Sequence, residues 1–155
     1  MNIEIMPNGI LKIDEARIIH RNFAGVADKY NREGERNFSV VIPNQDICDL
    51  LVEEGWNVKI KPPIDEDDEA FMYLPVKVKF NARGPKAFLL SGEKATELDA
   101  ESIACIDDVD ILSVDLDIRP YDWNTNGKSG RTAYLQGIWV VQKIDRFEAR
   151  FEARQ

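Results

Sequence analysis

Apolar and polar residues alternate through residues 71–80 (FMYLPVKVKF), a pattern that predicts a β-strand with two different faces. Because successive side chains of a strand point to opposite sides, the even-numbered residues, all of them apolar, share one face. The opposite face carries Phe71, Tyr73, Lys77 and Lys79. The first face is typical of a protein core. The second combines aromatic rings with positive charges, the residue types that stack nucleobases and neutralise phosphates.

Similar runs of apolar and β-branched residues predict further strands on both sides of this one. They lie at residues 10–25, 37–42, 57–61, 86–90, 110–123 and 131–144. The polar segment 27–36 and the segment 124–130 (NTNGKSG), which contains an Asn-Gly pair, are predicted to be hairpin loops. Pro75 falls inside the strand at 71–80, which favours an edge strand or a bulge there.

One helix is predicted between the second and third major strands. Asn44 can cap its N-terminus, the segment 45–54 (QDICDLLVEE) has an apolar face, and Gly55 follows its end. Residues 98–108 fit a short helix or an irregular segment.

Mostly antiparallel strands with a helix in the middle of the chain are the layout expected of a small closed or half-closed barrel. We therefore predict a mainly β fold, namely an OB-fold-like five-stranded antiparallel barrel with one helix and hairpin extensions. A β-sandwich is the alternative. One such domain is expected to span residues 1–155, with a core at about 10–145 and a C-terminal tail at 146–155.

The composition is that of a soluble globular protein, with 44% hydrophobic and 31% charged residues. No apolar run approaches the roughly 18 residues that cross a bilayer, and the N-terminus lacks the pattern of a secretory signal. Cys48 and Cys105 lie far apart and outside metal-binding spacing, so both are expected to be reduced, buried thiols. These features favour a cytoplasmic protein that does not contact a membrane.

Charge is unevenly distributed along the chain, whose formal net charge is −8. Residues 93–117 hold nine acidic side chains and one lysine, which together equal the net charge of the whole protein. Residues 57–90 hold six basic side chains, and their five acidic ones form a single run, DEDDE, that is expected in a loop. The strands that flank this loop are therefore basic, although the protein as a whole is acidic.

Catalytic constellations are absent from the sequence. The single histidine, His20, has no serine or cysteine partner at a recognisable spacing and is interpreted as a structural or surface residue. The segment 124–130 lacks the leading glycine and the following helix of a phosphate-binding loop. Asp115 and Asp117 share a strand face and could hold Mg²⁺ in a nuclease, although such carboxylates more often keep an exposed strand from pairing. We predict no enzyme, no metal and no cofactor.

Aromatic rings stand beside cations in four places. These are the basic strands around the DEDDE loop, the strand that enters the Asn-Gly hairpin, the end of the first strand, and the first hairpin loop. Stacking a base on a ring contributes about 1–3 kcal/mol, and each lysine or arginine adds a phosphate contact that is independent of sequence. The predicted nucleic-acid-binding residues are Arg21, Phe23, Lys29, Tyr30, Arg36, Lys59, Lys61, Phe71, Tyr73, Lys77, Lys79, Arg119, Tyr121, Trp123, Lys128 and Arg131. Tyr121 and Trp123 could instead cover a hydrophobic edge, and Trp56 and Trp139 are expected in the core.

Several segments of the chain resemble a known family. They are the RNF triplets at residues 21–23 and 36–38, GWNVK at residues 55–59, and the block IRPYDW…GKSG…AYL at residues 118–135. Around these segments, residues 16–144 look like the phage-encoded single-stranded DNA-binding proteins of OB-fold type. The resemblance implies a barrel whose aromatic residues stack bases and which coats replication or recombination intermediates without base specificity.

The C-terminus departs from this family. Many such proteins end in an acidic tail that recruits polymerases and helicases, whereas this chain ends in EARFEARQ. Either such a tail is absent or removed, or the recruitment of partners uses another acidic surface, such as residues 99–117.

The sequence therefore predicts a sequence-non-specific single-stranded DNA-binding protein of phage DNA replication or recombination, located in the host cytoplasm. Its expected partners are single-stranded DNA, replication or recombination proteins and, through the strand at 71–80, a second copy of the chain in a homodimer. Two alternatives stay open. One is an acidic protein-interaction or structural module that imitates nucleic acid, and the other is a metal-dependent nuclease.

Overall fold

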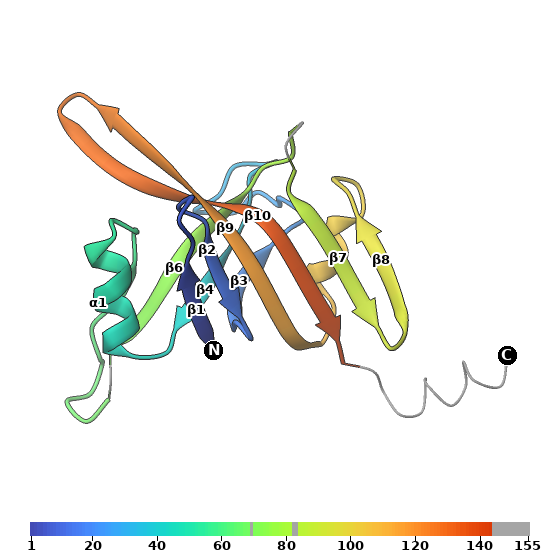
Figure 1. Cartoon of the computed structure of the whole chain (residues 1–155), viewed down its shortest axis with the longest axis horizontal. Coiled ribbons are helices and arrows are strands. Elements are labelled where there is room, and N and C mark those ends of the chain that lie inside the picture. Colours follow the sequence, from blue (N-terminus) through green and yellow to red (C-terminus); the bar gives the residue numbers. More distant parts are fainter. Residues whose placement is uncertain (69, 82–83, 144–155) are drawn as a thin grey trace, which may run out of the picture.

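Ten strands and two helices make up the described part of the computed structural model, which covers residues 1–68, 70–81 and 84–143 (Figure 1). The strands are β1 (Asn2–Ile5), β2 (Leu11–Asp14), β3 (Ile18–Asn22), β4 (Arg36–Ile42), β5 (Lys59–Lys61), β6 (Phe71–Val78), β7 (Lys86–Ser91), β8 (Lys94–Leu98), β9 (Ile111–Thr125) and β10 (Lys128–Gln142). The helices are α1 (Gln45–Glu53) and the 3₁₀-helix η1 (Ile103–Asp107). The tail expected at residues 146–155 lies outside the described residues.

The strands of the barrel pair in the order β2-β9-β10-β6-β4-β3, and its two end strands do not pair with each other. The chain itself connects these two ends, because only three residues separate β2 from β3. Among them, the Ala16 amide donates to the Val114 carbonyl of β9 over 2.8 Å, and the Arg17 carbonyl accepts from the Val41 amide of β4 over 2.9 Å. β2 and β3 therefore act as two halves of one bent strand. The mainly β, OB-fold-like architecture predicted from the sequence is confirmed.

The sequence predicts an antiparallel barrel, but two pairs of strands in the structure are parallel. β10 pairs antiparallel with β9 but runs parallel to β6 at Ala133 and Tyr134, and parallel to β7 at residues 137–141. Parallel neighbours need a long connection between them. The segment that contains β7, β8, η1 and β9 supplies this connection, and the sheet is therefore mixed.

β6 is an inner strand, not the edge strand that Pro75 suggested. β4 pairs with it at residues 72–78 without a shift of register. On its other side, β5 pairs with residues 71–73 and β10 pairs with residues 76 and 77. Pro75 lies between these two partners, where a missing backbone N–H interrupts neither pairing. Because β6 is paired on both sides, the structure gives no support to a homodimer that forms through an exposed edge of this strand.

The core confirms the two-faced pattern of β6. All four even-numbered residues of this strand are buried, whereas Phe71 and Lys77 on its other face are exposed. Phe23, just after β3, and Phe38 of β4 are fully buried and stack with their ring centroids 5.1 Å apart. Because apolar residues fill the inward faces, the outward faces of the same strands carry polar and aromatic side chains.

The sequence correctly predicts both ends of α1. The side chain of Asn44 accepts from an amide of the first turn over 2.9 Å, and Gly55, with a φ of 96°, follows the last turn. The amides of Gly55 and Trp56 donate to carbonyls of that turn, which are the two bonds of a Schellman motif. Cys48 is buried on this helix, whereas Cys105 is only half-buried, and both are free thiols.

Two aspartates of the acidic segment hold strand ends in place. Asp107 accepts from the amides of Phe23 and Ala24 over 2.8 and 3.0 Å, one through each carboxylate oxygen. Asp115 accepts from the amide of Glu15 over 2.9 Å, at the bend between β2 and β3, where Glu15 has a φ of 53°. Asp115, which the sequence analysis considered as a metal ligand, therefore binds a backbone amide. Within residues 1–68, 70–81 and 84–143, no group of three or more His, Cys, Asp or Glu side chains is placed to hold a metal ion.

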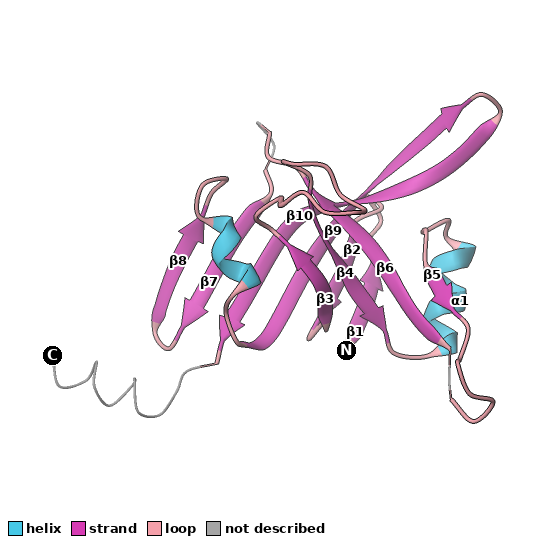
Figure 2. Cartoon of the chain, turned by 180° about the vertical axis from the view of Figure 1, so that it is seen from behind, coloured by secondary structure: helices cyan, strands magenta, loops and turns pink. Residues whose placement is uncertain are grey.

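Two hairpins extend the barrel in opposite directions. The β9–β10 hairpin projects beyond the barrel above α1 in Figure 1. Asn126 and Gly127 form its turn with φ angles of 53° and 78°, as a two-residue hairpin turn requires, so most of the loop predicted at 124–130 is strand. The β7–β8 hairpin lies at the end opposite α1 (Figure 2). The sequence pattern did not predict β8 or β1. No helix in the described part of the chain is long and apolar enough to span a membrane.

Replacing Asp117 by asparagine is expected to stabilise the protein at neutral pH. Burial raises the pKa of the Asp117 carboxyl, Lys12 on β2 opposes this shift, and Asp14 adds to it. A carboxyl whose folded pKa is raised costs stability once the pH exceeds its unfolded value, and this cost is complete above its folded value. Asp117→Asn should therefore raise the melting temperature at pH 7 by about 1–3 °C and lose this gain near pH 3.

Thermal unfolding at the two pH values measures this difference. Asp110→Asn, at an exposed residue just before β9, is the control and should change little. A lower melting temperature of Asp117→Asn at pH 7 would contradict the expectation.

Candidate nucleic-acid interface

Five side chains form a row across the outer face of the barrel. Successive cross-strand pairs link Asn22 of β3, Asn37 of β4, Lys77 of β6, Tyr134 of β10 and Arg119 of β9. Residues directly opposite each other in a sheet lie on the same face. Most of their neighbours along the chain are buried, so the row points outward. It brings two cations, one aromatic ring and two amide side chains together from five strands.

Three hollows follow this row, and we call them together the sheet groove. The loop-side hollow, of about 890 Å³, lies between β3, β6 and the loop at residues 23–35. The middle hollow, of about 160 Å³, is lined by residues of β4, β6 and β10. The hairpin-side hollow, of about 540 Å³, lies between the end of α1 and the base of the β9–β10 hairpin. Asn37 lines the first two hollows and Lys77 the last two, so each hollow adjoins the next along the row.

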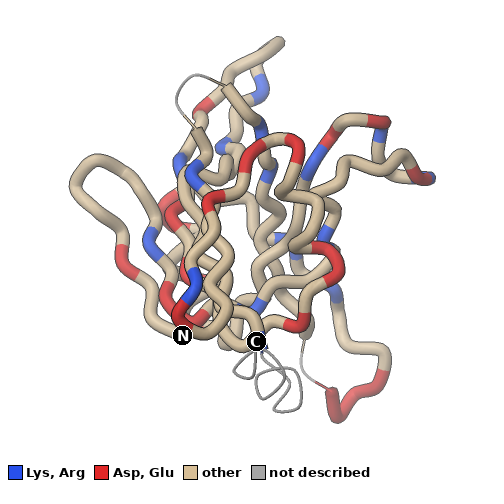
Figure 3. The backbone as a smooth tube through the Cα atoms, turned by 90° about the vertical axis from the view of Figure 1, so that its right-hand side faces the viewer, with Lys and Arg blue, Asp and Glu red and all other residues tan. Residues whose placement is uncertain are grey.

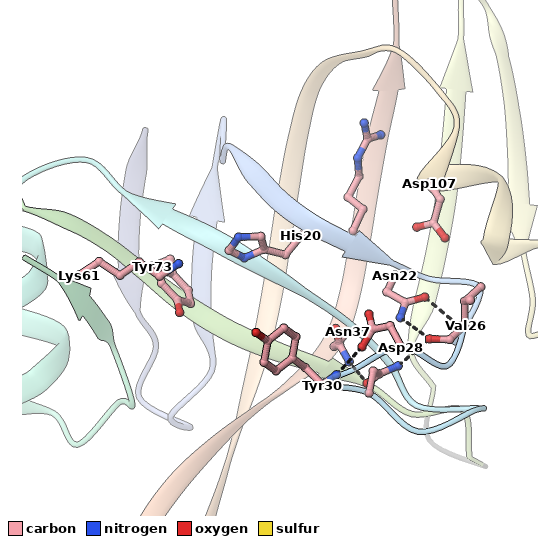
Figure 4. Close-up of a pocket in the computed structure, with 11 residues that line it drawn as sticks. His20, Asn22, Val26, Asp28, Tyr30, Asn37, Lys61, Tyr73 and Asp107 are labelled. Carbon is pink, nitrogen blue, oxygen red and sulfur yellow. Dashed lines mark hydrogen bonds between the residues drawn. The ribbon is translucent and has the colours of Figure 1, made fainter. Parts of the chain in front are cut away.

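Aromatic rings and a cation meet in the loop-side hollow (Figure 4). Tyr30 on the loop and Tyr73 on β6 point toward one another across it, and 88% of Tyr30 is exposed. Lys61 Nζ lies 5.7 Å from the centroid of the Tyr73 ring, and His20 meets this ring edge-on at 5.3 Å. A base can stack on either tyrosine while a phosphate contacts the lysine.

Asparagine side chains fix the loop at residues 23–35. Asn31 Nδ2 donates to the carbonyls of Glu35 and Val26 over 2.7 and 3.2 Å, and its Oδ1 accepts from Asn37 Nδ2 over 2.8 Å. Asn22 and Val26 exchange two further bonds, of 3.0 and 2.9 Å, between side chain and backbone. These bonds tie the loop to β3 and β4, so Tyr30 is held at the groove by a fixed backbone.

Asn31→Ala is therefore expected to weaken single-stranded DNA binding, because the substitution frees the loop that carries Tyr30. Each lost hydrogen bond is worth about 0.5–1.5 kcal/mol, and a freed loop must be ordered again on binding, which predicts a three- to tenfold or so loss of affinity. Fluorescence anisotropy measures the affinity, and hydrogen exchange of residues 23–35 should become faster. Asn8→Ala is the control, because Asn8 closes the β1–β2 turn and lines none of the three hollows. Unchanged exchange in the loop would contradict this role.

The middle hollow combines Tyr134 with Arg36, and a second arginine, Arg119, packs on the tyrosine from the border of the hollow. The Arg119 guanidinium lies 5.3 Å from the centroid of the Tyr134 ring, and Tyr121 meets that ring edge-on at 5.9 Å. The Arg36 guanidinium lies 5.2 Å from the Phe80 ring. Arg36 Nη1 is buried without a hydrogen-bond acceptor among the described residues. Such donors are rare in folded proteins.

Arg131 anchors the base of the β9–β10 hairpin to α1. Its Nε and Nη2 donate to the Asp122 carboxylate over 2.7 and 3.2 Å, and its Nη1 donates to the Glu54 carbonyl over 2.6 Å. The guanidinium also lies 5.3 Å from the Trp56 ring. The hydrogen bond between the two charged groups lowers the pKa of Asp122 and raises that of Arg131. The hairpin-side hollow therefore has a fixed wall.

Trp123 forms part of that wall. It lies opposite Gly130 on β10, and a Cβ atom at Gly130 would come within 2.6 Å of the indole ring. Only glycine lets the indole lie this close to the backbone. Trp123 remains 38% exposed, and Lys59 and Lys77 line the same hollow. A ring thus stands beside two cations here as well.

Most of the predicted residues line the sheet groove: Arg21, Tyr30, Arg36, Lys59, Lys61, Tyr73, Lys77, Lys79, Trp123 and Arg131. Arg119 and Tyr121 pack on Tyr134 at its border, and Lys29 lies 5.7 Å from the Tyr30 ring. Phe71 lines a separate hollow, and Lys128 directly follows the turn of the projecting hairpin. The structure therefore brings most candidates together from distant segments but leaves Phe71 and Lys128 outside the groove.

The prediction is wrong for Phe23, which is fully buried against Phe38. β3 contains a bulge, because it advances three residues from Ile19 to Asn22 while β4 advances two. Counting in twos along an unbroken strand places Phe23 outside. One extra residue exchanges the two faces, so Asn22 points outward and Phe23 points into the core.

Arg21 and Arg131 line the groove but have structural roles in the fold. Arg21 Nη1 donates to the carbonyls of Ile106 and Val109 over 2.8 and 2.9 Å, which fastens the end of η1 to β3. Arg131 holds the hairpin base, as described above. These two guanidinium groups therefore also position structural elements, and their contact with phosphate stays a prediction.

Several groove residues are absent from the predicted set, among them Tyr134, Asn37 and His20. Counting outward from the Asn-Gly turn pairs Tyr134 with Arg119, so a signal for the tyrosine was present in the sequence. The first triplet that resembles the family contains Asn22, and the second contains Asn37, but neither asparagine is in that set. For His20 no signal existed, because its position depends on the bulge in β3.

The groove is basic although the protein is acidic. Seven basic and three acidic side chains line its three hollows. Two of the acidic ones, Asp28 and Asp107, accept hydrogen bonds from backbone amides. The acidic residues 65–68, after β5, belong to a loop that stands away from the strands (Figure 3). The charge separation seen in the sequence thus becomes a separation in space.

Comparisons with known proteins concern the family and the fold. The model of a family described as "Putative phage ssDNA-binding domain" matches residues 3–154. No curated protein matches the sequence. Among solved structures, the single-stranded DNA-binding protein from bacteriophage Enc34 is similar with a TM-score of 0.57 and 15% identity, over 96% of this chain and 94% of that chain. The same phage protein in complex with ssDNA gives a TM-score of 0.54 and 16% identity, over 94% and 93% of the two chains. At these identities the structural likeness concerns the fold.

Proposed function

This chain belongs to the family of phage single-stranded DNA-binding domains, and we propose that it binds one strand of DNA along the sheet groove. Binding is independent of base sequence and serves phage DNA replication and recombination. The observation that carries this proposal is the outward row from Asn22 to Arg119, which is followed by three adjoining hollows lined by rings and cations.

Rings and cations have different roles in the groove. Tyr73, Tyr134 and Trp123 offer stacking surfaces in the three successive hollows, each worth about 1–3 kcal/mol per stacked base. Lys61 and Lys77 lie beside these rings and would contact phosphates. Each such contact releases counterions from the strand, so binding should weaken steeply with salt.

The groove suits single strands of any sequence. Every base has a ring face, and stacking on tyrosine or tryptophan does not read the hydrogen-bonding edges that distinguish the bases. In a duplex the same faces are covered by neighbouring base pairs. Stacking in the groove therefore needs unpaired bases.

Fluorescence anisotropy of a labelled oligo-dT strand tests the proposal at two salt concentrations, beside a duplex of equal length. We expect tight binding of the single strand, a steep loss of affinity with salt, and much weaker binding of the duplex. No binding of the single strand at low salt would refute the proposal. A pull-down for basic proteins would then test whether the acidic surface binds a protein partner instead.

The protein would act by binding alone, without catalysis or cofactor, in the cytoplasm of the phage host. Asp115 supports this, because the carboxylate that a nuclease would use holds a strand bend. Replication or recombination proteins are further proposed partners. A homodimer would have to pair through another edge than β6, for example β8, which pairs only with β7 among the described strands.

A further inference from the structure

His20 has a backbone conformation that histidine rarely adopts. Its φ is 54°, in the left-handed region, and it lies inside the bulge of β3. This conformation is uncommon for residues other than glycine and costs free energy that the surrounding structure must supply. Bulges of this kind redirect a side chain and often occur beside functional sites. The exposed imidazole of His20 is accordingly directed into the loop-side hollow (Figure 4).

Two contacts hold the imidazole in place. Nδ1 lies 3.3 Å from the hydroxyl of Ser39, which is itself buried, and the ring packs edge-on against Tyr73. With Nδ1 turned to Ser39, the other ring nitrogen, Nε2, is left for the hollow. In the neutral ring, either Nδ1 or Nε2 carries the single proton. In the protonated ring both nitrogens donate, so Nδ1 can bind Ser39 Oγ while Nε2 donates to a ligand.

Charged and titratable groups from every neighbouring element face the same hollow. They are Arg21 on β3, Asp28 and Tyr30 on the loop, Lys61 on β5, Tyr73 on β6 and Asp107 at the end of η1. Asp28 and Asp107 already accept hydrogen bonds from backbone amides. Lys61 lies against the Tyr73 ring, so the hollow already contains a cation suited to an anion.

We propose that protonated His20 binds a phosphodiester of the DNA strand through Nε2, and that single-stranded DNA binding is therefore coupled to the uptake of a proton. This inference rests on the proposed function of the groove. A phosphate beside the imidazole favours its charged form, and histidine is the side chain that ordinarily changes charge between pH 5 and 8. The strand should therefore bind more tightly as the pH falls through this range.

The test is the affinity for oligo-dT between pH 8.0 and pH 5.5, because thymine does not titrate there. We expect the wild-type protein to bind about three- to tenfold more tightly at pH 5.5. The salt dependence should also become steeper at pH 5.5, by about 0.7 in the slope of log K against log salt, as for one additional phosphate contact. His20 is the single histidine of the chain, so no other histidine contributes to this change.

His20→Asn is the matched variant, since asparagine tolerates the left-handed backbone conformation and carries no titrating group. It should bind oligo-dT with the same affinity and salt slope at both pH values. A wild-type protein whose affinity and slope do not change with pH would overturn the inference, as would a variant that keeps the wild-type pH dependence. If the variant does not fold, the wild-type protein alone decides. A salt slope that becomes steeper at pH 5.5 supports the inference, and an unchanged slope overturns it. Absence of binding at every pH would instead refute the proposed function.

Discussion

Lys77→Glu is expected to lower the affinity for single-stranded DNA by about 10- to 100-fold at low salt. Lys77 lines both the middle and the hairpin-side hollow, so reversing its charge affects the strand on two sides. A charge-assisted contact is worth about 1.5–3 kcal/mol, and the glutamate adds repulsion against the phosphates. The salt slope should fall by about 0.7 for each phosphate contact that is lost. Anisotropy titrations at several salt concentrations measure both quantities.

Lys94→Glu is the matched control for this variant. Lys94 is an exposed lysine at the start of β8, in the hairpin at the opposite end from α1, and the charge change is identical. If the two variants weaken binding equally, only the net charge of the protein matters and the groove has no special role. A preserved affinity in Lys94→Glu with a large loss in Lys77→Glu would place the strand at the groove.

The double variant Tyr73→Leu/Tyr134→Leu is expected to lose two orders of magnitude or so in affinity, because each ring stacks a base worth about 1–3 kcal/mol. Leucine keeps an apolar side chain at these half-buried positions but removes the ring face. Because tyrosine releases no counterions, the salt slope should stay at its wild-type value. This separates the double variant from Lys77→Glu, in which affinity and slope fall together.

Phe88→Leu provides the control for the loss of an aromatic ring. Phe88 on β7 stacks with Trp139 at a centroid distance of 6.3 Å, outside the sheet groove. This variant should keep the wild-type affinity, and thermal unfolding should show that all three proteins are folded. An unchanged affinity in the double variant would mean that bases do not stack on these two tyrosines.

The sequence predicts what depends on local periodicity. The alternation in residues 71–80 correctly separates a buried face from a face with rings and lysines, because a regular strand exposes every second side chain. The signals around α1 are also local, and Asn44 and Gly55 occupy the predicted cap positions. The Asn-Gly pair predicts the β9–β10 hairpin for the same reason.

What the sequence could not predict depends on contacts between distant segments. The bulge in β3 exchanges the faces of Asn22 and Phe23, and nothing in the local pattern marks an extra residue. Pro75 suggests an edge strand, yet the change of partner from β5 to β10 accommodates it within the sheet. The sequence suggests that Arg131 is a free cation, but in the structure its guanidinium donates to the Glu54 carbonyl at the end of α1. In each case a tertiary contact, absent from the local sequence, decides the role of the residue.

Photocrosslinking with oligo-dT that carries 5-iodouracil tests most directly whether the DNA strand follows the sheet groove. The halogenated base couples to aromatic side chains on which it stacks, and peptide mass spectrometry identifies the coupled residues. We expect crosslinks to Tyr30, Tyr73, Tyr134 and Trp123, which line the three hollows. Crosslinks confined to aromatic residues outside the groove, such as Phe88 and Trp139, would contradict the binding path.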